Sequence, residues 1–323
     1  MSGHVIALCG GVGGAKLAFG LAQALPPEAL SIVVNTGDDF EHLGLHVSPD
    51  IDTVAYTLAG LSDRERGWGL AGETWNFMAS LRRLGGETWF QLGDLDLAMH
   101  VERTRRLAAG ESLSQATAAL TASLGIRHPV IPMSDQPVRT VVKTTEGELA
   151  FQRYFVGEQC RPVATGVRFE GAAAASPSPA FQAALARDDL AAVIVCPSNP
   201  YLSVDPILAV PGVRAALDAL KAPIVAVSPI IGGKALKGPA AKLMSELGVT
   251  PGVVAVAEHY RGLLDGLVID TADAGEAAAL RQAGVEPLVT EAVMVTDEDR
   301  VRLAQEALAF SALFSQNAQR RRA

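Results

Sequence analysis

A glycine-rich run near the start of the chain has the residue types that bind phosphate groups. The glycines Gly10, Gly11, Gly13 and Gly14 directly follow the apolar residues 5–8, and Lys16 ends the run. Glycine lets the backbone approach a ligand closely, and the free N–H groups at the start of a helix attract an anion. The spacing matches neither the G-x-G-x-x-G nor the Walker A pattern, because Lys16 replaces the third glycine of the first and no Gly-Lys-Ser/Thr completes the second. The run indicates phosphate binding and equally suits a tight strand-to-helix connection.

Four aspartates lie close together in the sequence after this run: Asp38, Asp39, Asp50 and Asp52. Mg²⁺ prefers such a place, because it binds one or two carboxylates together with substrate phosphates and water. A carboxylate beside a phosphate site can also act as a general base. Asp50 or Asp52 alternatively suits the N-cap of a helix that begins near Thr53. We expect at least one of the four to be a metal ligand or base and another to be a cap.

Two histidine-containing stretches give weaker signals. His42 and His46 have the i, i+4 spacing of a zinc pair, but no third ligand with suitable spacing accompanies them. We therefore expect both in a loop or a pocket wall. Asp94 and Asp96 precede His100, and either aspartate suits the cap of the helix that would carry this histidine.

Turn-forming loops follow four of the predicted strands. They are residues 10–16, 36–39, 197–200 and 229–238. In an open parallel sheet, ligands bind beyond the carboxyl ends of the strands, so these loops would face one crevice. The candidate binding residues in and beside the last three loops are Asn35, Ser198, Asn199, Gly232 and Lys234. Each loop alone is explained by ordinary turn chemistry, so their convergence is the signal.

The elements that must position these residues alternate between strands and helices. Buried strands are predicted at residues 5–8, 31–35, 192–196, 224–228 and 267–270. Amphipathic or alanine-rich segments separate them, which predicts a Rossmann-like α/β fold: a mostly parallel sheet with helices on both faces. We assign residues 1–60 and 176–323 to this core.

Residues 61–175 differ from the rest of the chain in composition and in the pattern of predicted elements. We predict that they form a capping insertion. This stretch contains all three tryptophans, two predicted helices at residues 96–109 and 112–124, and a predicted antiparallel hairpin. The hairpin pairs residues 140–144 with 149–155 around Glu146-Gly147. The insertion would cover one side of the crevice that the four loops face.

Composition excludes several classes of protein. The 323 residues are 49% hydrophobic and 19% charged, with a formal net charge of -8, which argues against a nucleic-acid binder. No apolar stretch approaches the roughly 20 residues needed to cross a bilayer, and the start of the chain lacks the pattern of a secretory signal. Three separated cysteines supply neither a disulfide framework nor a metal knuckle. We expect a cytoplasmic protein that contacts no membrane.

Together these motifs resemble, in order, those of the 2-phospho-L-lactate transferase family. The matching stretches are residues 8–16, 35–39, 48–53, 67–69, 73–75, 92–94, 131–135, 197–200 and 228–232. The series extends from residue 4 to about residue 270, so it is specific where each motif alone is not. The resemblance implies a Rossmann-like core with a capping insertion, as the strand and helix pattern does, and it implies that the insertion lies on the side of the deazaflavin site.

The resemblance also implies a reaction. A guanylylated phospholactate would donate its phospholactyl group to the terminal ribityl hydroxyl of the deazariboflavin Fo, with Mg²⁺ required and GMP released, in the biosynthesis of coenzyme F-420. Dimers occur in the family, so a homodimer is expected. Functional coupling to the guanylyltransferase that makes the unstable donor is a further expectation.

Carried over by position, the resemblance assigns roles to the candidate residues. Residues 10–16 and 197–199 would bind the diphosphate and nucleotide, while Asp38 and Asp50 match positions of the metal and deazaflavin site and are the expected catalytic residues. Asp39 is the third expected metal ligand, and Asp94 a possible substrate-binding residue. Leu95 stands where many members have an arginine, and Gln91 occupies a position that is often basic. No cation contact is therefore expected at these two positions.

Two other functions compete with the transferase. A non-enzymatic regulator that binds a nucleotide or a nucleotide-sugar would share the glycine-rich opening. An NAD(P) dehydrogenase is disfavoured, because the second strand ends at Asn35 where an acidic residue would bind the ribose. No residue distinguishes phospholactate, phosphoenolpyruvate and phosphoglycerate as the transferred acid.

Overall fold

A seven-stranded parallel sheet forms the centre of the protein, whose computed structural model describes residues 3–320, with side chains to residue 314. The strand order is β14-β13-β10-β9-β1-β2-β5. The strands are β1 (His4–Cys9), β2 (Leu30–Val34), β5 (Val130–Pro132), β9 (Leu190–Val195), β10 (Ile224–Val227), β13 (Gly266–Asp270) and β14 (Glu286–Thr290). All neighbours pair in parallel, which confirms the predicted fold class and the five predicted strands.

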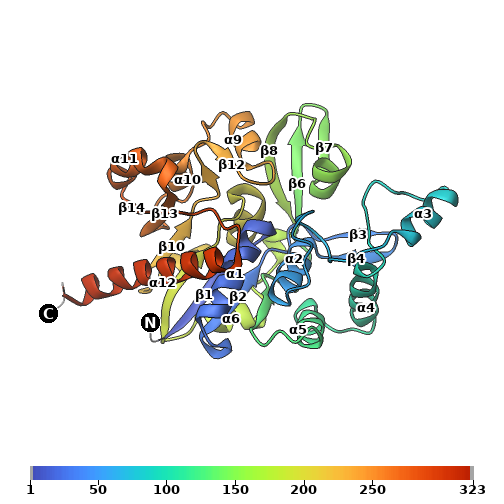
Figure 1. Ribbon diagram of the computed structural model, residues 1–323, viewed down its shortest axis with the longest axis horizontal. Coiled ribbons are helices and arrows are strands. Elements are labelled where there is room, and N and C mark those ends of the chain that lie inside the picture. Colours follow the sequence, from blue (N-terminus) through green and yellow to red (C-terminus); the bar gives the residue numbers. More distant parts are fainter. Residues whose placement is uncertain (1–2, 321–323) are drawn as a thin grey trace.

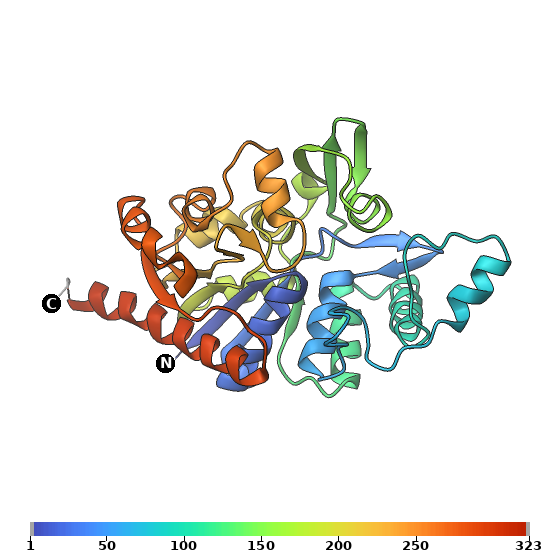
Figure 2. The same cartoon turned by 45° about the horizontal axis from the view of Figure 1, so that its top comes forward.

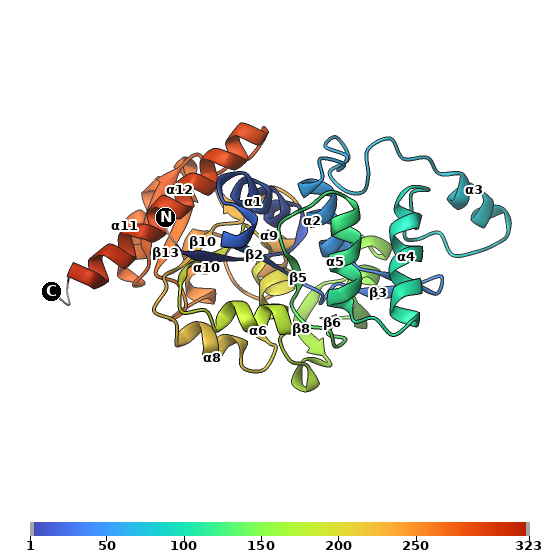
Figure 3. The ribbon, with the colours of Figure 1, turned by 90° about the horizontal axis from the view of Figure 1, so that it is seen from below.

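Apolar side chains on both faces explain why these strands lie inside the protein. In β1, Val5 and Ala7 pack into one core and Ile6 and Leu8 into the other, and all four are fully buried. Helices α1 (Gly11–Ala24), α2 (Pro49–Leu58) and α12 (Asp297–Arg320) contribute to the first core. Helices α6 (Pro179–Leu185), α8 (Val213–Asp218), α9 (Ala240–Glu246) and α10 (Val253–His259) contribute to the second. Figure 3 shows α1 and α12 on the opposite side of the sheet from α6 and α8.

One group of elements, which we call the cap, extends beyond the β5 edge of the sheet. The cap lies at the far end of the molecule from the end of α12 (Figures 1 and 2). It contains the hairpin β3 (Phe40–His42) and β4 (Leu45–Val47) and the helices α3 (Asn76–Arg83), α4 (Asp96–Ala108) and α5 (Leu113–Ser123). Helices α4 and α5 confirm the two predicted helices. Ser112 caps α5 in a reciprocal capping box with Gln115, which explains why the helix begins there.

A small antiparallel sheet, β7-β6-β8, lies beside the cap. Strands β6 (Arg139–Thr144) and β7 (Gly147–Ala150) confirm the predicted hairpin, and β8 (Ala164–Glu170) adds a strand that was not predicted. The prediction of strand at residues 151–155 is wrong, because Phe151 starts a helical segment that continues as the π-helix Arg153–Gly157. The rings of Phe151 and Phe155 stack at 5.4 Å, the neighbourhood that i, i+4 spacing gives on a helix.

Two sheet strands escaped the sequence prediction. Strand β5 comes from within residues 61–175 yet pairs with β2, so part of the predicted insertion belongs to the central sheet. Its three residues are too few to give a periodic signal. Strand β14 is an edge strand that contains Pro287, a residue tolerated at edges because it needs no ladder hydrogen bond.

The remaining elements are short. They are α7 (Asp205–Leu208), α11 (Ala277–Gln282), β11 (Ile230–Ile231), β12 (Lys234–Ala235), and the short helices Pro27–Ala29, Ala172–Ala174, Pro200–Val204 and Thr271–Glu276. Among the described residues, no helix combines the length and apolar character needed to cross a bilayer.

Candidate active site

The four predicted loops converge at one edge of the sheet. Strand β1 pairs with β2 on one side and β9 on the other, and β9 pairs with β10, so the loops follow four adjacent strands. The chain direction across the sheet reverses between β1 and β9, the point where open α/β sheets bind ligands. The tertiary structure therefore brings the candidate residues of all four loops to one place.

The glycine-rich turn packs directly against the loop after β9. The Ser198 hydroxyl donates to the Gly10 carbonyl at 2.8 Å and accepts from the Gly10 N–H at 3.1 Å. A Cβ on Gly13 would overlap the Pro197 carbonyl oxygen, and one on Gly14 would lie 2.5 Å from the Ser198 hydroxyl. The glycines at 13 and 14 are therefore required for contact between α1 and this loop.

Backbone conformation requires glycine at one position of the turn, Gly11, whose φ is +65°. We expected the glycines to allow close approach to a ligand. The packing of α1 against the loop after β9 and the backbone conformation at Gly11 are further reasons for glycine in this run. Helix α1 begins after Gly10, and this N-cap residue has no side chain that could cap the helix. The N–H groups of its first turn have no partners inside the helix, as anion binding requires.

Asp50 lies at the N-terminus of α1. Its Oδ1 accepts a hydrogen bond from the Gly11 N–H at 2.7 Å, and its Oδ2 accepts one from Asn35 Nδ2 at 2.9 Å. The same Asn35 nitrogen donates to Asp38 Oδ1 at 3.2 Å. Asn35 Oδ1 accepts from the Gly37 N–H at 2.7 Å, which fixes the orientation of the amide. Asn35 thus links the two predicted catalytic aspartates.

These two carboxyls titrate abnormally. Burial, followed by the charge of Asp50, raises the pKa of Asp38 well above its ordinary value. Burial also raises the pKa of Asp50 to about 6, although the hydrogen bonds from Asn35 and Gly11 oppose the shift. Two carboxyls of this kind can accept a proton near neutral pH or bind a cation that compensates their charge.

Only one of the two carboxylate oxygens of Asp39 has hydrogen-bond partners among the described residues. Its Oδ2 accepts hydrogen bonds from Ser48 Oγ at 2.8 Å and His46 Nε2 at 3.1 Å. Its Oδ1 is buried without a hydrogen-bond partner among the described protein atoms. An unpartnered buried carboxylate oxygen is costly unless a ligand or cation meets it.

Helix α2 begins at Pro49, four residues earlier than expected, and its N-cap is Ser48. The prediction that Asp50 or Asp52 caps a helix starting near Thr53 is therefore wrong, because Pro49 is well suited to the first helical position and moves the start forward. Both aspartates lie within the first turns of α2. Asp52 faces α4, where its carboxylate binds the buried guanidinium of Arg103.

Lys16 lies among other cations beside the turn. Its Nζ donates to the Met294 carbonyl at 2.7 Å, and burial lowers its pKa, with further contributions from the charges of Arg300, Lys237 and Arg64. These side chains come from three different segments of the chain. Arg64 and Arg300 are both paired with Asp297, so only part of this positive charge is available to an anionic ligand.

Asp94 lies at the start of α3. Its carboxylate accepts hydrogen bonds from Thr74 Oγ1, from the Asn76 N–H at 3.0 Å and from the Phe77 N–H at 3.0 Å, and these bonds lower its pKa to about 2. It therefore caps α3. Glu73 caps α4 through the N–H groups of residues 95 and 96, so the expected capping of α4 by Asp94 or Asp96 is wrong.

The remaining candidates lie in turns. Asn199 Oδ1 accepts from the N–H groups of Tyr201 and Leu202, while its buried Nδ2 has no partner among the described residues. Gly232 forms the turn between β11 and β12, and its N–H donates to Asp273. Lys234, the first residue of β12, is exposed.

His42 and His46 have different surroundings. His42 is buried beside Trp89, with ring centroids 5.2 Å apart, and also contacts Phe40 and Phe90. His46 binds Asp39. His42 is therefore part of an aromatic cluster in the cap.

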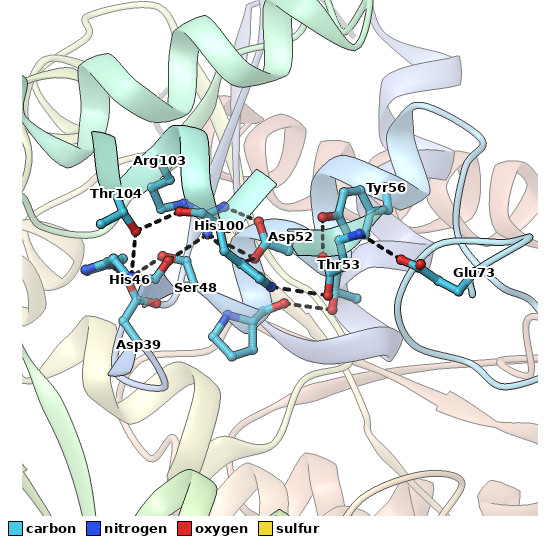
Figure 4. A network of polar contacts seen from close by, with 12 residues as sticks. Asp39, His46, Ser48, Asp52, Thr53, Tyr56, Glu73, His100, Arg103 and Thr104 are labelled. Atoms are coloured by element: carbon cyan, nitrogen blue, oxygen red, sulfur yellow. Dashed lines mark hydrogen bonds and ion pairs between the residues drawn. The ribbon is translucent and has the colours of Figure 1, made fainter. Parts of the chain in front are cut away.

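One group of three metal-binding side chains has its ligand atoms within 4.8 Å of one another in the described part of the chain: Asp52, Asp96 and His100. Arg103 already compensates the Asp52 charge with a guanidinium (Figure 4). His100 lies 3.2 Å from Asp96. This group is a protein-internal network. Sequence reasoning did not single out Arg103, which has no local motif and is identified only by its position on the buried face of α4.

Comparison with known proteins agrees with this architecture. The family model described as 2-phospho-L-lactate transferase CofD matches residues 5–309. The phosphoenolpyruvate transferase of Kitasatospora aureofaciens is 41% identical over 315 residues, 95% of this chain and 98% of that protein. The 2-phospho-L-lactate transferases of Methanopyrus kandleri and Methanosarcina mazei are 40% and 37% identical, covering 95% and 93% of this chain and 97% and 98% of those proteins.

A solved structure shares the fold. The crystal structure of a UPF0052-family protein from Bacillus halodurans aligns with a TM-score of 0.61 at 16% sequence identity, covering 95% of this chain and 99% of that one. The family match spans nearly the whole chain and the relatives align end to end. The chain therefore belongs to the 2-phospho-L-lactate transferase CofD family.

Proposed function

We propose that the protein transfers a phospho-carboxylic acid group from a guanylylated donor to the ribityl hydroxyl of Fo, releasing GMP, in coenzyme F-420 biosynthesis. Membership of the family supports a phospholactyl-type transferase. The observation that carries the proposal further is the position of Asp50 at the start of α1, bound to Gly11 and linked through Asn35 to Asp38. A phosphate site, two carboxyls and a nearby cationic group are what alcohol attack on phosphorus needs.

The carboxylates also support a requirement for Mg²⁺. A phosphate at the N-terminus of α1 would lie beside the Asp50 carboxylate, and the two anions would repel unless a cation lay between them. Asp38, Asp50 and the unpartnered Oδ1 of Asp39 would hold the ion. When bound, Mg²⁺ would neutralise charge on the transferred phosphoryl group.

The chain's own residues have three tasks in this reaction. The N–H groups of residues 12–14 and the side chains of Lys16 and Asn199 would bind the phosphates. Asp38, a buried carboxylate that Asn35 links to Asp50, would accept the proton of the Fo hydroxyl as that oxygen bonds to the phosphorus nearest the acid. The bond from this phosphorus to the GMP oxygen breaks, and GMP leaves with both electrons.

The names of the relatives do not decide which acid the donor carries. Relatives named phosphoenolpyruvate transferase and 2-phospho-L-lactate transferase are 41% and 40% identical to this chain. The decisive experiment supplies Fo, Mg²⁺ and guanylylated phospholactate, phosphoenolpyruvate or phosphoglycerate in separate reactions. Mass spectrometry should find a phosphodiester-linked deazaflavin and an equal amount of GMP in at least one. Bound Fo with an intact donor and no GMP in all three would favour the nucleotide-binding regulator instead.

Three expectations from the family resemblance belong to the same proposal. They are a homodimer, functional coupling to the guanylyltransferase and a cytoplasmic location. Light scattering after size exclusion tests the first. Transfer rates with a separately made donor, compared with rates when the guanylyltransferase makes it in the same tube, test the second.

A further inference from the structure

We propose that Arg103 is a positioning residue, which fixes the orientation of Asp50 through Asp52 and that of Asp39 through His46. The inference rests on the proposed function for the identity of the site that Asp39 and Asp50 form. Arg103 lies on α4 in the cap, and only 1% of the residue is exposed. It touches neither the glycine-rich turn nor the other loops of the crevice among its recorded polar contacts, so its effect has to pass through other residues.

The guanidinium of Arg103 binds both oxygens of Asp52. One terminal nitrogen donates to Asp52 Oδ2 at 3.2 Å and the other donates to Oδ1, as Figure 4 shows. A fork of this kind fixes the plane of the carboxylate as well as its distance, which a lysine cannot do. Arg103 therefore restrains the side of α2 on which Asp52 lies.

Asp50 and Asp52 lie on nearly opposite sides of α2. Two residues correspond to about 200° around an α-helix, so the side that binds Arg103 and the side that meets the glycine-rich turn face away from each other. Rotation of α2 about its axis would break the Arg103 bonds and would move Asp50 away from Gly11 in the same step. Arg103 and the Gly11 N–H thus fix the rotation of α2 from its two sides.

A second set of bonds from α4 acts on Asp39. The Arg103 guanidinium lies 3.4 Å from the His46 carbonyl oxygen, and the hydroxyl of Thr104 accepts from the His46 N–H at 2.8 Å. Both backbone polar groups of His46 are therefore held by consecutive residues of α4. The His46 ring then binds Asp39 Oδ2, which leaves Oδ1 as the oxygen free for a ligand.

A purely structural role for the Arg103–Asp52 pair is the alternative. Removing Arg103 alone would leave the buried Asp52 unpaired and could prevent folding, so that variant cannot separate the two roles. Replacing both partners by apolar residues of similar size commonly preserves stability. The paired variant Asp52→Leu with Arg103→Met therefore removes the positioning bonds while it keeps a packed interior.

The test measures the metal affinity and the kinetics of this paired variant. Mn²⁺ binding is followed by electron paramagnetic resonance in the absence of substrates, with folding checked by near-ultraviolet circular dichroism and Tm. We expect affinity for Mn²⁺ and kcat to fall by about 10- to 100-fold, the range seen when residues that orient metal ligands are lost, with KM for Fo less affected. The Mn²⁺ affinity and kcat of Arg103→Lys should lie between those of the parent and those of the paired variant. Arg105→Met, on the exposed face of the same helix, is the control and should change neither.

Each outcome decides. A folded paired variant with parental Mn²⁺ affinity and kcat overturns the inference and leaves Arg103 a structural residue. If the paired variant does not fold, Arg103→Lys, which keeps the charge and removes the fork on Asp52, is measured in the same way, and unchanged affinity and kcat overturn the inference. A parent protein that binds Mn²⁺ but transfers no group refutes the proposed function alone, whereas a parent that binds no Mn²⁺ refutes the positioning role.

Discussion

The Oδ1 atom of Asp50 accepts a hydrogen bond from the Gly11 N–H at 2.7 Å, so a carboxylate occupies the helix N-terminus that the sequence predicts for a phosphate. The positive end of α1 stabilises the ionised carboxylate, while burial raises its pKa to about 6. A substrate phosphate can join this carboxylate only if the added negative charge is compensated. This relationship makes Asp50 the centre of the following predictions.

Asp50→Asn should fold and should lower kcat by at least about 100-fold, the scale of a lost metal ligand or base. Asn keeps an oxygen that can accept from the Gly11 N–H, so the backbone of the turn is preserved. Steady-state kinetics with Fo and the guanylylated donor measure the effect. Asp218→Asn, an exposed residue paired with Arg214, is the matched control. Near-normal turnover of the folded Asp50→Asn protein would remove Asp50 from the site.

The stability difference between Asp50→Asn and the parent should depend on pH. Because the folded-state pKa of Asp50 is raised to about 6, its ionised form opposes folding; no penalty exists below the unfolded value of about 4, and the penalty is complete above about 6. The shift corresponds to about 3 kcal/mol. The free energy of unfolding is measured with urea in metal-free buffer from pH 4 to 8. The stability of the variant relative to the parent should rise with pH up to about pH 6 and then stay constant. A pH-independent difference would contradict burial as the cause of the raised pKa of Asp50.

Removal of divalent metal should abolish transfer without unfolding the protein. EDTA should stop GMP release, and excess Mg²⁺ should restore it, because Asp38, Asp39 and Asp50 concentrate negative charge where the phosphates would bind. Circular dichroism in EDTA should remain unchanged, because the two cores consist of buried apolar side chains. Full turnover in EDTA after extensive dialysis would rule out the proposed metal site.

Gly13→Ala should weaken GDP binding through the loop after β9. A Cβ at residue 13 would overlap the Pro197 carbonyl oxygen, so the loop that carries Ser198 and Asn199 has to move. Overpacking of this kind costs about 1–3 kcal/mol, and Tm should fall accordingly. Calorimetry with GDP and thermal unfolding measure the two effects. Gly275→Ala, where a Cβ meets open space, should change neither. Unchanged GDP affinity in Gly13→Ala would show that the loop after β9 does not contribute to binding.

Asp94→Ala should loosen helix α3 more than it slows the chemistry. The carboxylate of Asp94 caps α3 while Glu73, which precedes α3, caps α4, so the two loops exchange caps. Loss of Asp94 removes the partners of the Asn76 and Phe77 N–H groups. Limited proteolysis should cut residues 73–94 faster than in the parent, with kcat lowered less than by Asp50→Asn. A large loss of kcat with unchanged proteolysis would restore Asp94 to the substrate site.

The local sequence determined the strands and turns that build the site. Short apolar runs ending in glycine, asparagine or proline identified β1, β2, β9 and β10, because buried parallel strands need apolar side chains on both faces and the turns after them need special backbone geometry. Convergence of their loops followed from parallel topology. The family motifs then assigned Asp38 and Asp50 to the same crevice.

Only the tertiary structure decided what each carboxylate does. Asp50 and Asp52 look alike in sequence, yet one meets Gly11 and the other Arg103, because α2 begins at Pro49 and turns them to opposite sides. The carboxylate of Asp94, a predicted substrate-binding residue, caps α3, a contact that the sequence did not predict. Partners such as Asp52 and Arg103 are 51 positions apart, so their pairing depends on how whole elements pack, and no local pattern of residues records it.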